Sequence, residues 1–372
     1  MKILIKQFLG KNHSWSVCGW GIARALKKLN HEVHLFSTDG IDHFPLDLKE
    51  NLIGYCNSNS FTLISGRDAD KNYDMQISYT APRNFPFYLS NGSKNRFGIW
   101  TYEWNGKNVL PSGFAKNHQH CDAILAPSNF SKDIFINSGV PENKIKVIPH
   151  GIDKTQYVGT STIQLNTNKK FKILANIAQN HKRKNIPGLL EVYGKAFTKN
   201  DDVCLILKGK SKKVENTFDV SLDDCIKNFK KQFPNHAEYK IYTEFIDDIS
   251  SLYRSVDAVF TMSHGEGFFF PGLEAAASKK ITIAPNYGGQ LDFLNLNNSL
   301  LISGTEERAD PKSMYWEQKN NAVWFRPDID DAVDKLRHAY ENFEDFNSNI
   351  DNKSIIENYK WDNIVQQMLK LT

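Results

Sequence analysis

One stretch in the second half of the chain constrains the fold most strongly. An apolar run at 258–262 is followed by Gly265 and Gly267, then by Pro271 and a Glu-Ala-Ala-Ala segment, and then by a second apolar run at 281–284. The apolar runs have strand length, the glycines permit a sharp turn, and the proline suits the start of a helix. The stretch therefore predicts a strand, a glycine turn, a helix and a second strand.

This unit carries two carboxylates, Glu266 in the turn and Glu274 near the start of the helix. Free backbone N–H groups of such a turn and of the first helical turn lie at the carboxyl end of the strand and can bind phosphate. Carboxylates repel phosphate, but they accept strong hydrogen bonds from vicinal hydroxyls. A nucleotide sugar, with phosphates between two diols, fits both features. The alternative is that Glu274 only complements the helix dipole and Glu266 is a solvated turn residue.

Short apolar runs alternate with helical sequence along most of the chain, which predicts an α/β protein with parallel sheets covered by helices. We expect two doubly wound domains, at 1–165 and 166–352, and a closing helix at 353–372 that returns toward the first domain. The expected strands are 2–8, 32–37, 52–56, 61–65, 75–79, 97–100, 123–127, 146–149, 171–178, 203–208, 240–245, 258–262, 281–284 and 300–302.

Gly19 and Gly21 precede an expected helix at 22–29 and fall in an expected loop at 10–21. They form a G-x-G, but Arg24 stands where the full dinucleotide motif has its third glycine. The two glycines either let the backbone approach a ligand or only turn the chain.

Composition excludes several classes of protein. The chain has 372 residues and a net charge of +4, which does not indicate binding to nucleic acid. Its 5 cysteines are odd in number and include no C-x-x-C pair, which fits a reduced cytoplasm and no structural zinc. No apolar run has membrane-spanning length. We expect a cytoplasmic protein and leave open its contact with the inner face of a membrane.

With these residues in place, the chain resembles the retaining glycosyltransferases of family 4, which have the GT-B fold. The strongest match is the E-x7-E pattern from Glu266 to Glu274. Supporting motifs occur in the family's order, at 126–128, 139–141, 147–153, 183–185, 257–259 and 285–289. The resemblance covers most of the chain, and it implies two Rossmann-like domains that face each other across a cleft.

The resemblance also implies roles for individual residues. Glu274 would hold the ribose hydroxyls of the donor, and Glu266 would lie beside the transferred sugar. Lys184, with Arg183, would neutralise the diphosphate, since fixed cations can stabilise such a leaving group without a metal. Further donor contacts would come from the backbone of Gly267, Phe268 and Phe269 and, near the base, of Phe245 and Ile246.

The chain departs from the family pattern at several positions. Phe269 stands where the family commonly has glycine, so its ring could reshape the donor-sugar pocket. The family's upstream arginine has no clear counterpart, because Ala178 and Gln179 occupy that neighbourhood. Glu103 follows the strand after which many members have a histidine. It either takes part of that role on the acceptor side, together with Gly19 and Gly21, or is a structural hydrogen-bond acceptor.

The sequence thus predicts a retaining glycosyltransferase that moves a hexose from a UDP- or GDP-sugar to a hydroxyl of a glycan, lipid-linked or protein-linked acceptor during synthesis of a surface polysaccharide or glycoconjugate. We expect neither a metal nor a cofactor, because Asp201-Asp202 and Asp247-Asp248 are typical of turns rather than of a metal-binding D-x-D motif. Two alternatives remain: an epimerase of the same fold, and a non-catalytic scaffold that binds nucleotide sugars.

Overall fold

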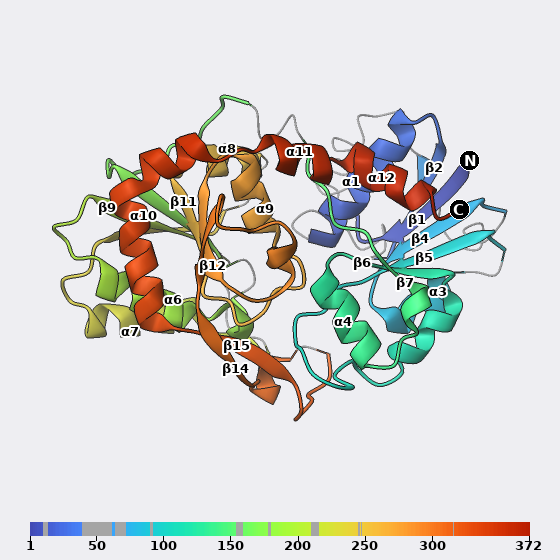
Figure 1. Cartoon of the computed structure of the whole chain (residues 1–372), viewed down its shortest axis with the longest axis horizontal. Helices are drawn as coiled ribbons and strands as arrows, with labels where there is room; N and C mark the ends of the chain where they lie inside the picture. Colours follow the sequence, from blue (N-terminus) through green and yellow to red (C-terminus); the bar gives the residue numbers. More distant parts are fainter. Residues whose placement is uncertain are drawn as a thin grey trace. The chain divides into compact units, whose positions relative to one another are not determined.

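The computed structural model divides the chain into two compact units. Unit 1 comprises Met1–Tyr102, Leu110–Asp153 and Asn358–Thr372, and unit 2 comprises Glu103–Val109 and Lys154–Glu357 (Figure 1). The structure describes residues 1–9, 14–38, 62–63, 72–89, 92–153, 159–177, 180–209, 216–244, 246, 248–314 and 316–372. The expected strand at 52–56 lies outside the described residues.

Unit 1 is built on a parallel sheet with the strand order β3-β2-β1-β4-β5-β6-β7. The order reverses between β1 and β4, as in doubly wound folds. The strands are β1 (Lys2–Gln7), β2 (Glu32–Ser37), β3 (Thr62–Leu63), β4 (Met75–Tyr79), β5 (Asn95–Ile99), β6 (Ala123–Ala126) and β7 (Ile145–Val147). Among the described residues of this unit, the α-helices are α1 (Ser14–Lys28), α3 (Phe85–Tyr88), α4 (Asn129–Asn137) and α12 (Trp361–Leu369).

The expected loop before α1 is wrong for residues 14–21, because α1 begins at Ser14 and contains both glycines. A Cβ on Gly19 would lie 1.2 Å from the Gln7 side-chain oxygen, and a Cβ on Gly21 would lie 2.1 Å from the ring of Trp361. The glycines therefore allow α1 to pack closely against β1 and α12. Both interpretations of these glycines, a backbone contact with a ligand and a simple turn of the chain, assumed a loop, and that premise does not hold.

The C-terminal helix α12 packs against α1 within unit 1. The ring of Trp361 lies against Gly21 and Gly151, and Lys360 forms a backbone bridge with Ile152. The expected closing helix is two helices, α11 (Lys353–Tyr359) and α12, because Lys360 between them has an extended backbone.

Unit 2 has a second parallel sheet, with the order β10-β9-β8-β11-β12-β13. Its order reverses between β8 and β11. The strands are β8 (Phe171–Asn176), β9 (Val203–Lys208), β10 (Glu238–Tyr242), β11 (Ala258–Phe260), β12 (Ile281–Pro285) and β13 (Ser299–Ile302). The helices are α6 (Ile186–Ala196), α7 (Leu222–Gln232), α8 (Ile249–Arg254), α9 (Phe270–Ala277) and α10 (Ile329–Asn349).

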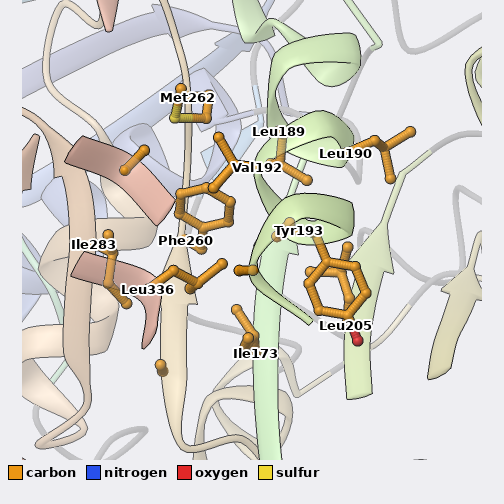
Figure 2. Packing of buried hydrophobic residues seen from close by; sticks show 14 of the residues in the cluster. Ile173, Leu189, Leu190, Val192, Tyr193, Leu205, Phe260, Met262, Ile283 and Leu336 are labelled. Atoms are coloured by element: carbon orange, nitrogen blue, oxygen red, sulfur yellow. The ribbon is translucent and has the colours of Figure 1, made fainter. Parts of the chain in front are cut away.

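The core of unit 2 lies between this sheet and the helices α6 and α10. Val192 and Tyr193 of α6 share one buried cluster with Ile173, Phe260 and Leu336 (Figure 2). Each such side chain contributes about 1.5–3 kcal/mol when it is buried. This packing fixes the strand ends, and with them the loops that follow β8 and β11.

An antiparallel hairpin between β13 and α10 was not expected from the sequence. It pairs β14 (Gly304–Arg308) with β15 (Val323–Pro327), and neither strand is among the expected ones. The strand β14 is mostly polar and exposed, so it gives no apolar alternation. In the part of the chain that the structure describes, no helix is long and apolar enough to cross a bilayer.

Candidate functional site

The candidate site lies at the carboxyl ends of β8 and β11, which are parallel neighbours at the point where the strand order of unit 2 reverses. Ligands of open α/β sheets bind at such switch points. The loop after β8 carries Arg183 and Lys184 in a short 3-10 turn, and the turn after β11 carries Glu266. Asn185 ends the 3-10 turn in a left-handed conformation and caps α6 by accepting a hydrogen bond from the amide of Gly188.

Glu266 is the centre of a buried ion cluster. Its Oε1 lies 2.7 Å from Nζ of Lys184 and 3.0 Å from Nη1 of Arg183. The side chains of Glu266 and Arg183 are each 8% exposed, and that of Lys184 is 13% exposed. The structure thus brings together three residues that the sequence analysis assigned to the site.

The cluster controls the ionisation of its members. Burial alone would raise the pKa of Glu266, but the adjacent Arg183 and Lys184 outweigh burial and lower that pKa to about 2. Burial lowers the pKa of Lys184, and the neighbouring Glu266 only partly offsets this effect. Glu266 is therefore a carboxylate at neutral pH, and Lys184 would gain from a second anionic partner.

Arg183 is bound mainly by the turn that carries Glu266. Its Nη1 donates to the carbonyl oxygen of Gly265 and lies 3.4 Å from Oγ of Ser263. The backbones are also joined, since the amide of His264 donates to the carbonyl of Arg183 at 2.8 Å. The guanidinium thus holds two loops together as well as facing Glu266.

The loop after β12 forms a backbone hydrogen bond with the turn that carries Glu266. The amide of Gly289 donates to the carbonyl of Glu266 at 2.8 Å. Gly288 has a φ of +96°, and a Cβ there would lie 2.8 Å from the same carbonyl oxygen. A glycine is therefore required at position 288 both by its backbone conformation and by the close approach.

Glu103 lies elsewhere than expected. We assigned it to the acceptor side in the N-terminal domain, but residues Glu103–Val109 belong to unit 2. Its Oε1 is 3.9 Å from Nη2 of Arg183, and its side chain is 13% exposed. The sequence did not show this, because the strand β5 that precedes Glu103 belongs to unit 1.

Glu274 is half-buried on α9. The helix begins at Phe270, with Pro271 in its second position, so Glu274 lies just past the first turn rather than within it. That position weakens the alternative in which Glu274 serves only the helix dipole, whose effect is greatest in the first turn. Its role at the ribose remains a prediction.

Phe269 adopts a left-handed conformation, with φ +73° and ψ +68°, immediately before α9. A residue with a Cβ is strained there. Its ring is buried against α9, since a Cβ on Gly272 would lie 2.5 Å from it. The ring therefore packs on the first turn of the helix, and its backbone continues from the buried residues Gly267 and Phe268.

Of the other residues predicted for the site, some lie elsewhere in the protein and some lie outside the described residues. Ile246 is half-buried and packs against a small core cluster that includes Leu252 and Val259. Phe245 lies outside the described residues, as do Ala178 and Gln179. Gly19 and Gly21 lie within α1 of unit 1 and are not part of the ion cluster.

His264, which was not among the predicted site residues, joins the site to the hairpin. Its Nδ1 lies 2.7 Å from the carbonyl oxygen of Phe325, and its ring stacks on Trp324 with a centroid distance of 4.1 Å. Burial lowers the pKa of His264, although the contact with Phe325 raises it in part. The position of His264, two residues before Glu266, was the one available signal.

This arrangement can bind an anionic group next to a polyhydroxyl group. The cations of the loop after β8 can meet phosphate, while Glu266 and Glu274 can accept hydrogen bonds from hydroxyls. The cations also lie where they can stabilise negative charge that develops on a leaving group.

Two family models match this chain. The model described as glycosyl transferases group 1 matches residues 160–342, and the model described as glycosyltransferase family 4 matches residues 20–156. A curated relative, an uncharacterized glycosyltransferase of Methanocaldococcus jannaschii, is 20% identical over 281 residues. That match covers 73% of this chain and 64% of the relative, so it spans just under two thirds of the relative's length.

Solved structures share the fold. A glycosyltransferase from Rickettsia africae superposes with a TM-score of 0.71 at 17% identity, over 100% of this chain and 97% of that chain. Anabaena HepE in complex with UDP-glucose gives a TM-score of 0.66 at 15% identity, over 100% of this chain and 98% of that chain. These similarities and the two parallel sheets confirm the expected two-domain α/β fold of the GT-B type.

Proposed function

Because this chain belongs to the group 1, family 4 glycosyltransferases, we propose that it is a retaining, metal-independent enzyme that transfers a hexose from a UDP- or GDP-sugar. The acceptor in this proposal is a hydroxyl of a glycan, lipid-linked or protein-linked molecule in the synthesis of a surface polysaccharide or glycoconjugate.

The observation that carries the proposal is the contact between Lys184 and Glu266 at the switch point of unit 2. In the proposed reaction, the bond between the anomeric carbon and the diphosphate oxygen breaks, and negative charge grows on the diphosphate. The oxygen of the acceptor hydroxyl bonds to the same carbon from the same face, and its proton passes to the leaving diphosphate. Lys184 leaves Glu266 and pairs with that charge. Glu266, still held by Arg183, accepts hydrogen bonds from hydroxyls of the transferred sugar.

The proposed nucleotide contacts lie along the same edge of the sheet. Glu274 accepts hydrogen bonds from the two ribose hydroxyls, and the backbone from Gly267 to Phe269 faces the sugar and the diphosphate. The UDP-glucose complex of Anabaena HepE, a protein of the same fold, supports a uridine donor. We place the enzyme in the cytoplasm, and the buried free thiols of Cys18, Cys121 and Cys204 support that location.

Retention is tested by the configuration of the product. The protein is incubated with α-linked UDP- and GDP-hexoses and a panel of alkyl glycosides, and the anomeric coupling constant of the new linkage is measured by NMR. An α-linked product supports the proposal, and a β-linked product contradicts it. A reaction without acceptor that isomerises the donor would instead identify an epimerase.

A further inference from the structure

The segment Glu103–Val109 is attached to the hairpin of unit 2 by its backbone. Asn105 exchanges two hydrogen bonds with Val323, of 2.9 Å and 2.8 Å. The indole of Trp104 donates to Oγ of Ser313 at 3.3 Å, and Trp104 is buried. These contacts fix the position of Glu103 beside the turn that carries Glu266.

Glu103 meets that turn through its backbone as well as its side chain. A Cβ on Gly265 would lie 2.4 Å from the carbonyl oxygen of Glu103. The carboxylate lies 3.9 Å from Nη2 of Arg183, whereas Glu266 lies 3.0 Å from Nη1. Arg183 is thus placed between two carboxylates.

The two cations of the cluster are held differently. Arg183 contacts Gly265 and Glu266 with one nitrogen and faces Glu103 with the other. Lys184 contacts Glu266 through its single ammonium, on a long flexible side chain. The formal charges of the two carboxylates and the two cations cancel.

We propose that Glu103 is a positioning residue: it holds Arg183 on the Glu266 turn and balances its charge, so that Lys184 is the cation that exchanges between Glu266 and the donor diphosphate. This inference rests on the proposed function of the site. It assigns Glu103 to the donor-binding site in unit 2, whereas the sequence had suggested the acceptor side.

The charge balance of this cluster predicts a measurable change in nucleotide affinity when one carboxylate is removed. Replacing Glu103 by glutamine leaves the cluster with one extra positive charge in a poorly solvated place. A nucleoside diphosphate then binds more tightly, by about tenfold, because Coulomb interactions are strong where water is excluded. The product leaves more slowly, so kcat falls while the donor KM also falls.

The experiment is calorimetric titration of UDP and GDP into the full-length wild type, Glu103→Gln and the control Glu341→Gln, which loses an exposed partner of Arg337 on α10. We expect tighter binding to Glu103→Gln and unchanged binding to the control. The same substitution is then made in the Arg183→Gln and Lys184→Gln backgrounds. Its effect should be smaller without Arg183, whose position Glu103 is proposed to set, and should persist without Lys184.

The possible results distinguish a failure of the proposed glycosyltransferase function from a failure of the role proposed for Glu103. A wild type that binds neither nucleotide overturns the proposed function. A wild type that binds one, together with unchanged or weaker binding to Glu103→Gln, overturns only the role of Glu103, as does an effect that is undiminished without Arg183. If Glu103→Gln fails to fold, Gly265→Ala displaces Glu103 sterically, and weaker or unchanged nucleotide binding to that variant overturns the inference.

Discussion

The ammonium of Lys184 lies 2.7 Å from Oε1 of Glu266, although the two residues are 82 positions apart in the chain. Each residue lies in the loop that follows one of two neighbouring parallel strands, β8 and β11. The contact therefore depends on the register of the sheet, and it places a cation on an ionised carboxylate where a donor diphosphate is proposed to bind.

Replacing Lys184 by alanine should lower kcat/KM for the donor by about 100-fold, because the charge that grows on the leaving diphosphate loses a fixed cation. Steady-state kinetics with saturating acceptor measure this effect. Lys195→Ala, which removes a half-exposed lysine of α6 that pairs with Glu191, is the matched control and should keep full activity. Equal activity in the two variants would remove Lys184 from the reaction.

Glu266→Gln should change how stability depends on pH. The pKa of Glu266 is about 2 in the folded protein and 4.5 without its surroundings, so its carboxylate stabilises the fold fully above pH 4.5 and loses this effect as the pH falls through 2. We expect the wild type to have a larger free energy of urea unfolding than the variant at pH 7. This difference in free energy of unfolding should narrow by about 2 kcal/mol between pH 7 and pH 3. A difference that stays constant would show that Glu266 is not held as an ion.

Much of the fold was predictable because its strands are apolar and lie between helices with clear caps. The strands β2, β4 and β9 have the predicted bounds, and Ser128 caps α4 by accepting a hydrogen bond from the amide of Ser131. The start of α1 was not predictable. Its glycines normally indicate a loop, and only Gln7 and Trp361, which are distant in sequence, explain them.

The candidate site was partly predictable for the same physical reason. Motifs at strand ends placed Arg183, Lys184 and Glu266 near one another, since the carboxyl ends of parallel strands meet at one edge. Glu103 was misplaced because chain order suggested the first domain. Its position depends on the backbone pairing of Asn105 with Val323 of β15, a long-range contact that the sequence around Glu103 does not show.

Phe269→Gly should destabilise the protein without changing donor preference. Glycine relieves the strain of the left-handed backbone, worth about 1 kcal/mol, but loses a buried ring worth about 3 kcal/mol. The free energy of unfolding, measured in urea, should therefore fall by about 2 kcal/mol. A tenfold change in the ratio of kcat/KM values for two donor sugars, without loss of stability, would instead place the ring in the donor pocket.

Glu274→Ala should raise the donor KM about tenfold or more, because two hydrogen bonds from ribose hydroxyls to a carboxylate are lost. A 2′-deoxy donor provides the matched comparison. It should bind the wild type as weakly as the normal donor binds the variant, and the variant should not distinguish the two donors. A variant that still prefers the normal donor would show that Glu274 does not contact the ribose.

Removal of divalent metal should leave transfer intact, because the proposed charge stabilisation comes from Lys184 and from backbone amides. Activity is measured after dialysis against EDTA and again after addition of Mg²⁺ or Mn²⁺. Rates within about twofold of the untreated protein agree with the proposal, since loss of an essential metal costs far more. Loss of activity with EDTA, restored by either ion, would contradict it.

Nucleotide binding tests the central claim most directly. A thermal-shift panel of UDP, GDP, ADP and their sugars is applied to the wild type, Lys184→Ala and Glu274→Ala, because a ligand that binds only the native state raises its Tm. We predict that at least one nucleoside diphosphate raises the Tm of the wild type and has a much smaller effect on both variants. No response from the wild type, or an equal response from all three proteins, would contradict the assignment of the donor site.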